Sequence, residues 1–75
     1  MLIMSYDRKK IIKARSLEVS KNYGGKKDEK WVISAAANEF TTVVAAVFSD
    51  EKMAVDALEK AFLAFEDGAK CYRFD

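Results

Sequence analysis

The sequence predicts an α+β domain in which a small antiparallel sheet, a three-stranded meander, is followed by one helix and a short C-terminal strand. Two patterns carry this prediction: apolar residues recur at helical spacing near the C-terminus, and two central runs are rich in apolar, β-branched and aromatic residues. The chain has 75 residues, of which 51% are hydrophobic and 33% charged, and no proline. This length and composition are typical of one folded domain, spanning residues 1–75.

A helix is expected from Asp50 to Asp67. Ser49 is the expected N-cap, because a serine hydroxyl accepts a hydrogen bond from a free amide of the first turn. Gly68 stands where helices commonly end in a residue with left-handed backbone. The apolar stripe predicted to face the core consists of Ala54, Val55, Leu58, Ala61, Phe62 and Phe65.

The three strands of the meander are expected at residues 15–23, 31–37 and 40–48. Gly24 and Gly25 lie in the first connecting loop, where they are expected to supply positive φ angles. Asn38 and Glu39 are expected to form the tight turn between the second and third strands. The consecutive residues 41–44, Thr-Thr-Val-Val, favour a pleated strand over a helix.

A three-helix bundle is the alternative fold. The central apolar residues also fit a helical stripe, with Asp28 as the N-cap of a second helix and the two glycines ending a first one. Because β-branched residues crowd the turns of a helix, residues 41–44 decide in favour of the sheet.

The two ends of the chain are predicted less fully. The first ten residues form either a first strand, carrying Leu2, Met4 and Tyr6, or a frayed arm. Residues 69–74 alternate and are rich in aromatic side chains, which predicts a short terminal strand. Cys71 in this strand is expected to be buried, as free cysteines commonly are.

The strand at residues 40–48 is apolar on both faces. Under strict alternation one face carries Thr42, Val44, Ala46 and Phe48, and the other carries Thr41, Val43, Ala45 and Val47. One helix covers only one face of a small sheet, so the second face needs a partner. That partner is the N-terminal arm, a second copy of the chain or a target protein. Trp31 is expected to anchor the core.

Residue types that the chain lacks argue against catalysis and metal binding. There is no histidine and only one cysteine, so the commonest general base and the commonest zinc ligands are missing. We therefore expect no enzyme activity, no cofactor and no metal site. No apolar run reaches the roughly 20 residues that span a bilayer, and the N-terminus lacks signal-peptide features. A cytoplasmic protein without membrane contact is expected.

The net charge of +1 conceals a polarised chain. Residues 1–30 carry nine basic and four acidic residues, a charge of +5, whereas residues 31–75 carry four basic and eight acidic residues, a charge of −4. The candidate basic patch consists of Arg8, Lys9, Lys10, Lys13, Arg15, Lys26, Lys27 and Lys30. Such residues neutralise the phosphates of a nucleic acid, or they lie beside the acidic helix in the fold.

A second candidate surface lies on the expected helix. Met53 and Leu63 project on the charged side, opposite the core stripe, where a solvated helix normally carries polar residues. With the neighbouring carboxylates they form a candidate binding face of Met53, Asp56, Glu59 and Leu63. An apolar and charged face of this kind is typical of a protein-binding surface.

The leading functional hypothesis is a non-catalytic protein-binding module that docks onto a protein target and also self-associates as a homodimer. Its size, and the expected lack of catalytic groups, fit the small inhibitors and modulators that phages and mobile elements make against host complexes. The alternative hypothesis is a nucleic-acid-binding accessory protein that uses the basic N-terminal third.

Overall fold

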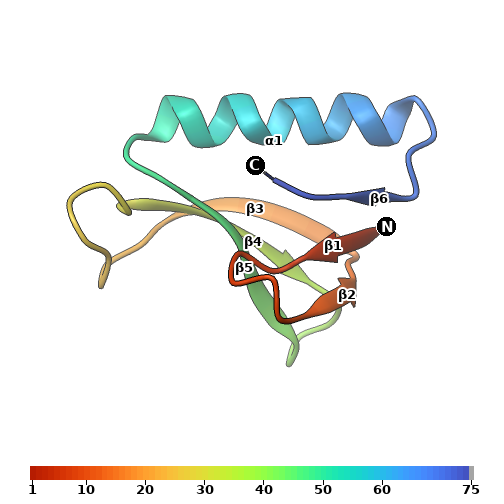
Figure 1. Cartoon of the computed structure of the whole chain (residues 1–75), viewed down its shortest axis with the longest axis horizontal. Helices are drawn as coiled ribbons and strands as arrows, with labels where there is room; N and C mark the ends of the chain where they lie inside the picture. The colour runs from red at the N-terminus through yellow and green to blue at the C-terminus, as the bar shows by residue number, and fades with distance from the viewer. Residues whose placement is uncertain (75) are drawn as a thin grey trace.

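The computed structural model describes residues 1–74 and contains six strands and one helix within that range (Figure 1). In chain order the elements are β1 (Leu2–Met4), β2 (Ile11–Lys13), β3 (Ser16–Lys21), β4 (Trp31–Ala36), β5 (Thr42–Phe48), α1 (Glu51–Glu66) and β6 (Cys71–Tyr72). The predicted α+β class is confirmed, with the meander, the helix and the C-terminal strand in the expected order. The three-helix alternative is wrong.

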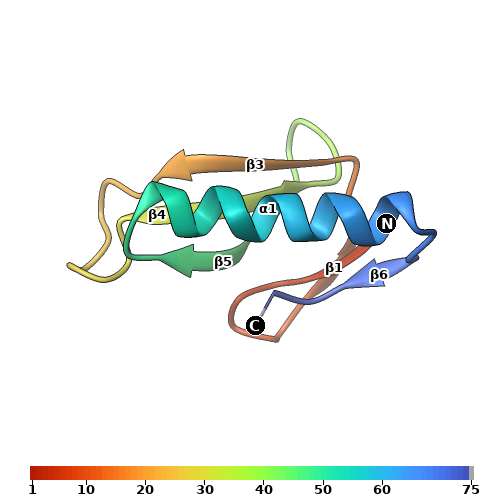
Figure 2. The same ribbon diagram turned by 90° about the horizontal axis from the view of Figure 1, so that it is seen from above.

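The strands form two small sheets rather than one. The meander is the sheet β3-β4-β5, in which both neighbouring pairs are antiparallel. The second sheet has the order β2-β1-β6: β1 pairs antiparallel with β2 and parallel with β6. The helix lies across one face of the meander, and the second sheet lies on the same side of the meander, beside the helix (Figures 1 and 2).

The chain passes from the second sheet to the meander at two consecutive residues. The amide of Ala14 donates to the carbonyl of Met1 at 2.8 Å, and the amide of Arg15 donates to the carbonyl of Ala36 at 2.7 Å. Each bond ties the chain to a different sheet, so β2 and β3 act as one strand with a sharp bend. The N-terminal residues therefore form an ordered hairpin rather than a frayed arm. Tyr6 lies in its loop, outside β1.

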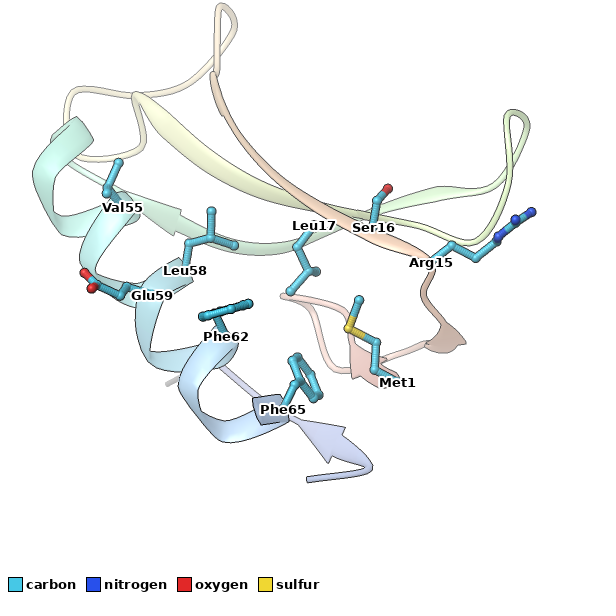
Figure 3. A pocket seen from close by; sticks show the side chains of 9 residues that line it. All are labelled: Met1, Arg15, Ser16, Leu17, Val55, Leu58, Glu59, Phe62 and Phe65. Carbon is cyan, nitrogen blue, oxygen red and sulfur yellow. The ribbon is translucent and has the colours of Figure 1, made fainter. Parts of the chain in front are cut away.

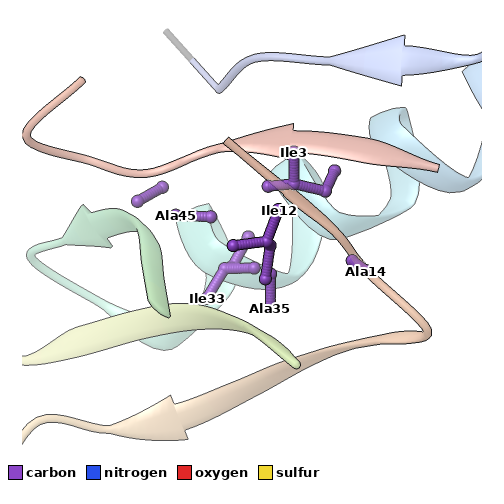
Figure 4. Packing of buried hydrophobic residues seen from close by; sticks show 7 residues of the cluster. Ile3, Ile12, Ala14, Ile33, Ala35 and Ala45 are labelled. Carbon is purple, nitrogen blue, oxygen red and sulfur yellow. The ribbon is translucent and has the colours of Figure 1, made fainter. Parts of the chain in front are cut away.

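The core lies between the meander, the helix and the second sheet (Figure 4). Ile3 of β1 and Ile33 of β4 are the largest side chains that are fully buried among the described residues. The helix contributes mainly small side chains, because Ala54 and Ala61 are its buried residues. Leu58 and Phe65, both partly buried, pack against the cluster beside them.

A bulge in β5 corrects the predicted division of its faces. Ile33 pairs with Ala46, whereas the next residue, Ser34, pairs with Val44, so Ala45 is the extra residue. Ala45 and Ala46 are both buried as a result. Beyond the bulge the alternation is shifted by one residue. The outward face of β5 therefore carries Thr42, Val44 and Val47 and is less apolar than strict alternation implies.

The helix ends confirm one capping prediction and correct the other. Asp50, not Ser49, is the N-cap: its carboxylate accepts a hydrogen bond from the amide of Met53 at 2.9 Å. A carboxylate also interacts favourably with the positive end of the helix dipole. Gly68 has φ of +98°, as predicted. The amides of Gly68 and Ala69 bond back to the last turn, which closes the helix in a Schellman motif.

Several other residues lie elsewhere than expected. Phe40 is in the β4–β5 turn and almost fully exposed, because Asn38 accepts hydrogen bonds from the amides of Phe40 and Thr41 and delays the strand to Thr42. Trp31 begins β4 and is only partly buried, so it does not anchor the core. Neither Gly24 nor Gly25 has a positive φ.

We predict that the fold needs glycine at position 25 because a larger residue does not fit there, and not because of the backbone φ angle. A Cβ there would overlap the carbonyl oxygen of Glu29 and press on the Asn22 amide that bonds to that carbonyl. Gly25→Ala should lower the free energy of unfolding by about 1–3 kcal/mol, the usual cost of overpacking. Gly24→Ala is the matched control, since its Cβ meets nothing within 4 Å. Equal stabilities of the two variants in urea titrations would contradict this.

Candidate protein-binding surface

The outward half of α1 exposes four large apolar side chains among its charged residues. Its exposed apolar side chains and their exposed fractions are Met53 at 51%, Val55 at 46%, Phe62 at 63% and Leu63 at 51%. Asp56 and Glu59 lie among them and are also exposed. These six residues are called the helix outer face below. A solvated helix normally keeps one side polar, so this surface is suited to burial against a partner.

The exposure follows from how the helix packs. Ala54, Ala57, Ala61 and Ala64 recur every three or four residues and turn toward the core, which brings the helix axis close to the sheet. With the alanines at the centre of the contact, Val55 and Phe62 move to its margin. The sequence-based stripe was therefore wrong for these two residues, although Ala54, Leu58, Ala61 and Phe65 face inward as predicted. The alanine spacing was the signal that could have corrected it.

A groove of about 590 Å³ runs between α1 and β3 along this margin (Figure 3). Leu17 of β3 forms its floor and points toward Leu58 and Phe62 of the helix. Met1 and Phe65 close one end of the groove, whereas the side chain of Arg15 points away from it (Figure 3). The groove is thus apolar inside, with charged residues at its rim.

The structure places the four predicted helix-face residues on the helix outer face, and all four are exposed. Met53 and Asp56 border a second hollow of about 400 Å³, next to Phe74. Glu59 borders the groove on the opposite side of the helix, and Leu63 lies on the crest between the two hollows. The predicted face is one surface, and the structure adds Val55 and Phe62 to it.

The predicted basic patch does not form one surface. Its eight residues are all exposed but fall into three groups: Arg8, Lys9 and Lys10 in the β1–β2 loop, Lys13 and Arg15 at the bend, and Lys26, Lys27 and Lys30 in the β3–β4 loop. The last two groups lie at opposite ends of β3, which is roughly 20 Å long at about 3.3 Å per residue. Within residues 1–74 none of the eight forms a salt bridge.

The β1–β2 loop is held by its own hydrogen bonds. Asp7 accepts from the hydroxyl of Ser5 at 2.6 Å and from the amide of Lys9 at 3.0 Å. These bonds, led by the one from Ser5, lower the pKa of the Asp7 carboxyl below its ordinary value. Arg8 has φ of +63°, an uncommon backbone conformation for a residue with a side chain. The amide of Tyr6 bonds to the carbonyl of Val44 at 2.7 Å and attaches the loop to β5.

Cys71 is exposed, contrary to the prediction. Its neighbour Tyr72 is the residue of β6 that turns inward, where its ring lies 5.9 Å from Phe65 and 4.9 Å from Phe74. Alternation along the strand then points Cys71 outward.

Among residues 1–74, no cluster of three or more potential metal-binding side chains is present. No helix in the same range has the length and apolar character needed to cross a membrane. Comparison with protein-family models, curated proteins and solved structures returned no match for this chain.

We predict that Asp7 stabilises the fold in a pH-dependent way. Because its pKa is lower in the folded chain than in the unfolded one, its contribution is present at neutral pH and is lost as the pH falls through the folded pKa. A carboxyl titration followed by NMR should give a midpoint for Asp7 below that of an ordinary aspartate. In Ser5→Ala the midpoint should rise toward the ordinary value. An unchanged midpoint would exclude the Ser5 hydroxyl as the main cause.

Proposed function

We propose that this protein is a non-catalytic binding module that docks onto another protein through the helix outer face. The observation that carries the proposal is the exposure of Met53, Val55, Phe62 and Leu63 on a single helix. Removing exposed apolar surface of this kind from water favours association, and what remains after the entropy lost on binding appears as affinity. Asp56 and Glu59 add charge around the apolar residues, and polar groups in that position give a protein interface its specificity.

The proposal extends to the role of the complex. A folded domain of 75 residues is small enough to occupy a surface of a larger assembly without contributing chemistry. We place it with the inhibitors or modulators that phages and mobile elements direct at host complexes in the cytoplasm. The supporting arguments are its size and a sequence without histidine.

Replacing two side chains of the helix outer face tests the proposal. Phe62→Ser/Leu63→Ser should reduce the partner captured from a host lysate at least about tenfold, since a few apolar residues carry most interface energy. The control is Phe40→Ser, which removes an aromatic side chain that is 93% exposed in the β4–β5 turn and belongs to neither candidate surface. The control should capture as much partner as the unaltered protein. Equal losses in the two variants would refute the docking surface.

Nucleic-acid binding by the β3–β4 loop is the second candidate function. Tyr23 in this loop is 90% exposed, and the ammonium of Lys21 lies 5.8 Å from the centre of its ring. Lys26, Lys27 and Lys30 follow in the same loop. An exposed aromatic ring among basic residues is the arrangement that single-stranded nucleic acids use for base stacking and phosphate contact.

Binding to short single-stranded DNA and RNA, measured at about 50 and 200 mM salt, tests this second function. Affinity should fall steeply with salt, and Tyr23→Ala should weaken binding in both salts by removing a stacking platform. Arg8→Ala/Lys9→Ala removes two basic residues from the β1–β2 loop. Comparing it with Tyr23→Ala distinguishes binding by the β3–β4 loop from binding by the N-terminal basic residues. If the protein binds neither probe at low salt, nucleic-acid binding is excluded.

A further inference from the structure

β3 forms an edge of the meander. Within residues 1–74 its only neighbouring strand is β4, and its other side faces away from the molecule (Figure 2). The edge is six residues long, contains no proline and is antiparallel to β4 without a bulge from Ser16 to Lys21. An unprotected edge of this kind is a template for pairing with another strand.

The hydrogen-bond pattern shows which backbone groups point outward. The amide of Asn22 bonds to the carbonyl of Lys30 at 2.7 Å, and the register continues with Ser20 opposite Val32 and Glu18 opposite Ser34. In an antiparallel ladder, every second residue bonds to the same neighbour. The even-numbered residues of β3 therefore bond to β4. The amides and carbonyls of the alternate residues, Leu17, Val19 and Lys21, point toward the open edge.

We propose that a second copy of this chain occupies the edge, with the two β3 strands antiparallel about a twofold axis at Val19. Leu17 then pairs with Lys21 of the second copy, and Val19 pairs with its own counterpart. This register uses every outward residue and forms about six hydrogen bonds between the copies, two for each of three pairs. The two meanders join into one sheet of six strands.

Two neighbouring symmetric registers are less favourable. An axis at Glu18 places the two Glu18 carboxylates directly opposite each other, where like charges are destabilising. An axis at Leu17 requires the backbone of Arg15 to pair with Val19 of the second copy. The amide of Arg15 is already bonded to the carbonyl of Ala36. The axis at Val19 avoids both problems and places Glu18 opposite the neutral Ser20.

In this register, Lys21 of the second copy lies next to the groove, and the groove is suited to bind it. Lys21 lies on the same face of β3 as Leu17 and Val19, so Lys21 of the second copy enters beside the groove floor at Leu17. Its aliphatic stem is suited to cover the exposed Phe62. Glu59 and Glu66 flank Phe62 on the helix surface, three residues before and four after it, and are complementary to the ammonium group.

The dimer also supplies what a small domain lacks. Ile3 and Ile33 are the only large side chains that residues 1–74 bury completely, and a core this small gains much from association. The second copy adds strands in the plane of the sheet and not above the helix. The second copy therefore reaches Phe62 and Glu59 at the groove, whereas Met53, Asp56 and Leu63 of both helices stay open on the same side of the joined sheet.

Amide exchange measured against protein concentration tests the interface directly. As sedimentation shows the dimer forming, the amides of Leu17, Val19 and Lys21 should exchange about tenfold or more slowly, because they become hydrogen-bonded. The amides of Glu18 and Ser20 are the internal control and should be protected at every concentration. A protein that stays monomeric at millimolar concentration overturns the proposal, as does a dimer in which the three amides remain unprotected.

Charge reversal at the groove gives a second, independent measurement. Lys21→Glu should raise the dimer dissociation constant about tenfold, since it faces Glu59 and Glu66 twice in the symmetric dimer. Lys27→Glu makes the same change of net charge in the β3–β4 loop and should leave the constant within about threefold. Equal effects of the two variants would place the interface elsewhere. Circular dichroism confirms that both variants are folded.

Discussion

The packing of α1 on the meander through alanine side chains is the constraint on which the rest of the structure depends. Ala54 and Ala61 are completely buried and hold the helix against the core. Small side chains at the contact leave little helix surface buried. Ile3 and Ile12 of the second sheet therefore supply large side chains to the core. The same constraint moves Val55 and Phe62 to the margin of the contact and creates the groove.

The second sheet exists because the two ends of the chain meet. The amide of Leu2 donates to the carbonyl of Lys70 at 2.9 Å, and β1 pairs in parallel with β6. Among the strand pairs of residues 1–74, this one has the longest sequence separation, and it gains nothing until the helix has brought residue 70 back across the meander. Tyr72 then fills the space between Phe65 and Phe74. The second sheet and the helix therefore stabilise each other.

Folding keeps the opposite charges of the chain apart. The basic residues lie in the β1–β2 loop, at the bend and in the β3–β4 loop, whereas acidic residues lie along α1. Within residues 1–74, no salt bridge joins the basic residues of the first third to the helix. One molecule consequently offers an apolar helix rimmed by carboxylates and a strand edge rimmed by basic residues. The proposed dimer brings these two kinds of surface together between copies.

The sequence by itself determined the fold class, the order of the meander, the helix and the C-terminal strand, and the helix end at Gly68. These follow from local physics: helical spacing of apolar residues, β-branched residues in strands, and the left-handed backbone that glycine allows. It also identified Met53, Asp56, Glu59 and Leu63 as an exposed face, because residues opposite an apolar stripe face outward whatever the helix packs on. The identities of these residues needed no knowledge of the partner elements.

The tertiary structure alone decided the second sheet, the bulge at Ala45 and the exposure of Val55, Phe62 and Cys71. Each depends on a contact between segments far apart in the chain. β2 has three residues and no distinctive pattern, and only its pairing with β1 defines it as a strand. Val55 and Phe62 belong to the apolar stripe by spacing. They are exposed because the helix packs on the core through its alanines, which leaves these two residues at the margin of the contact. The spacing of apolar residues predicts which residues share a face, but it does not predict how much of that face the neighbouring elements cover.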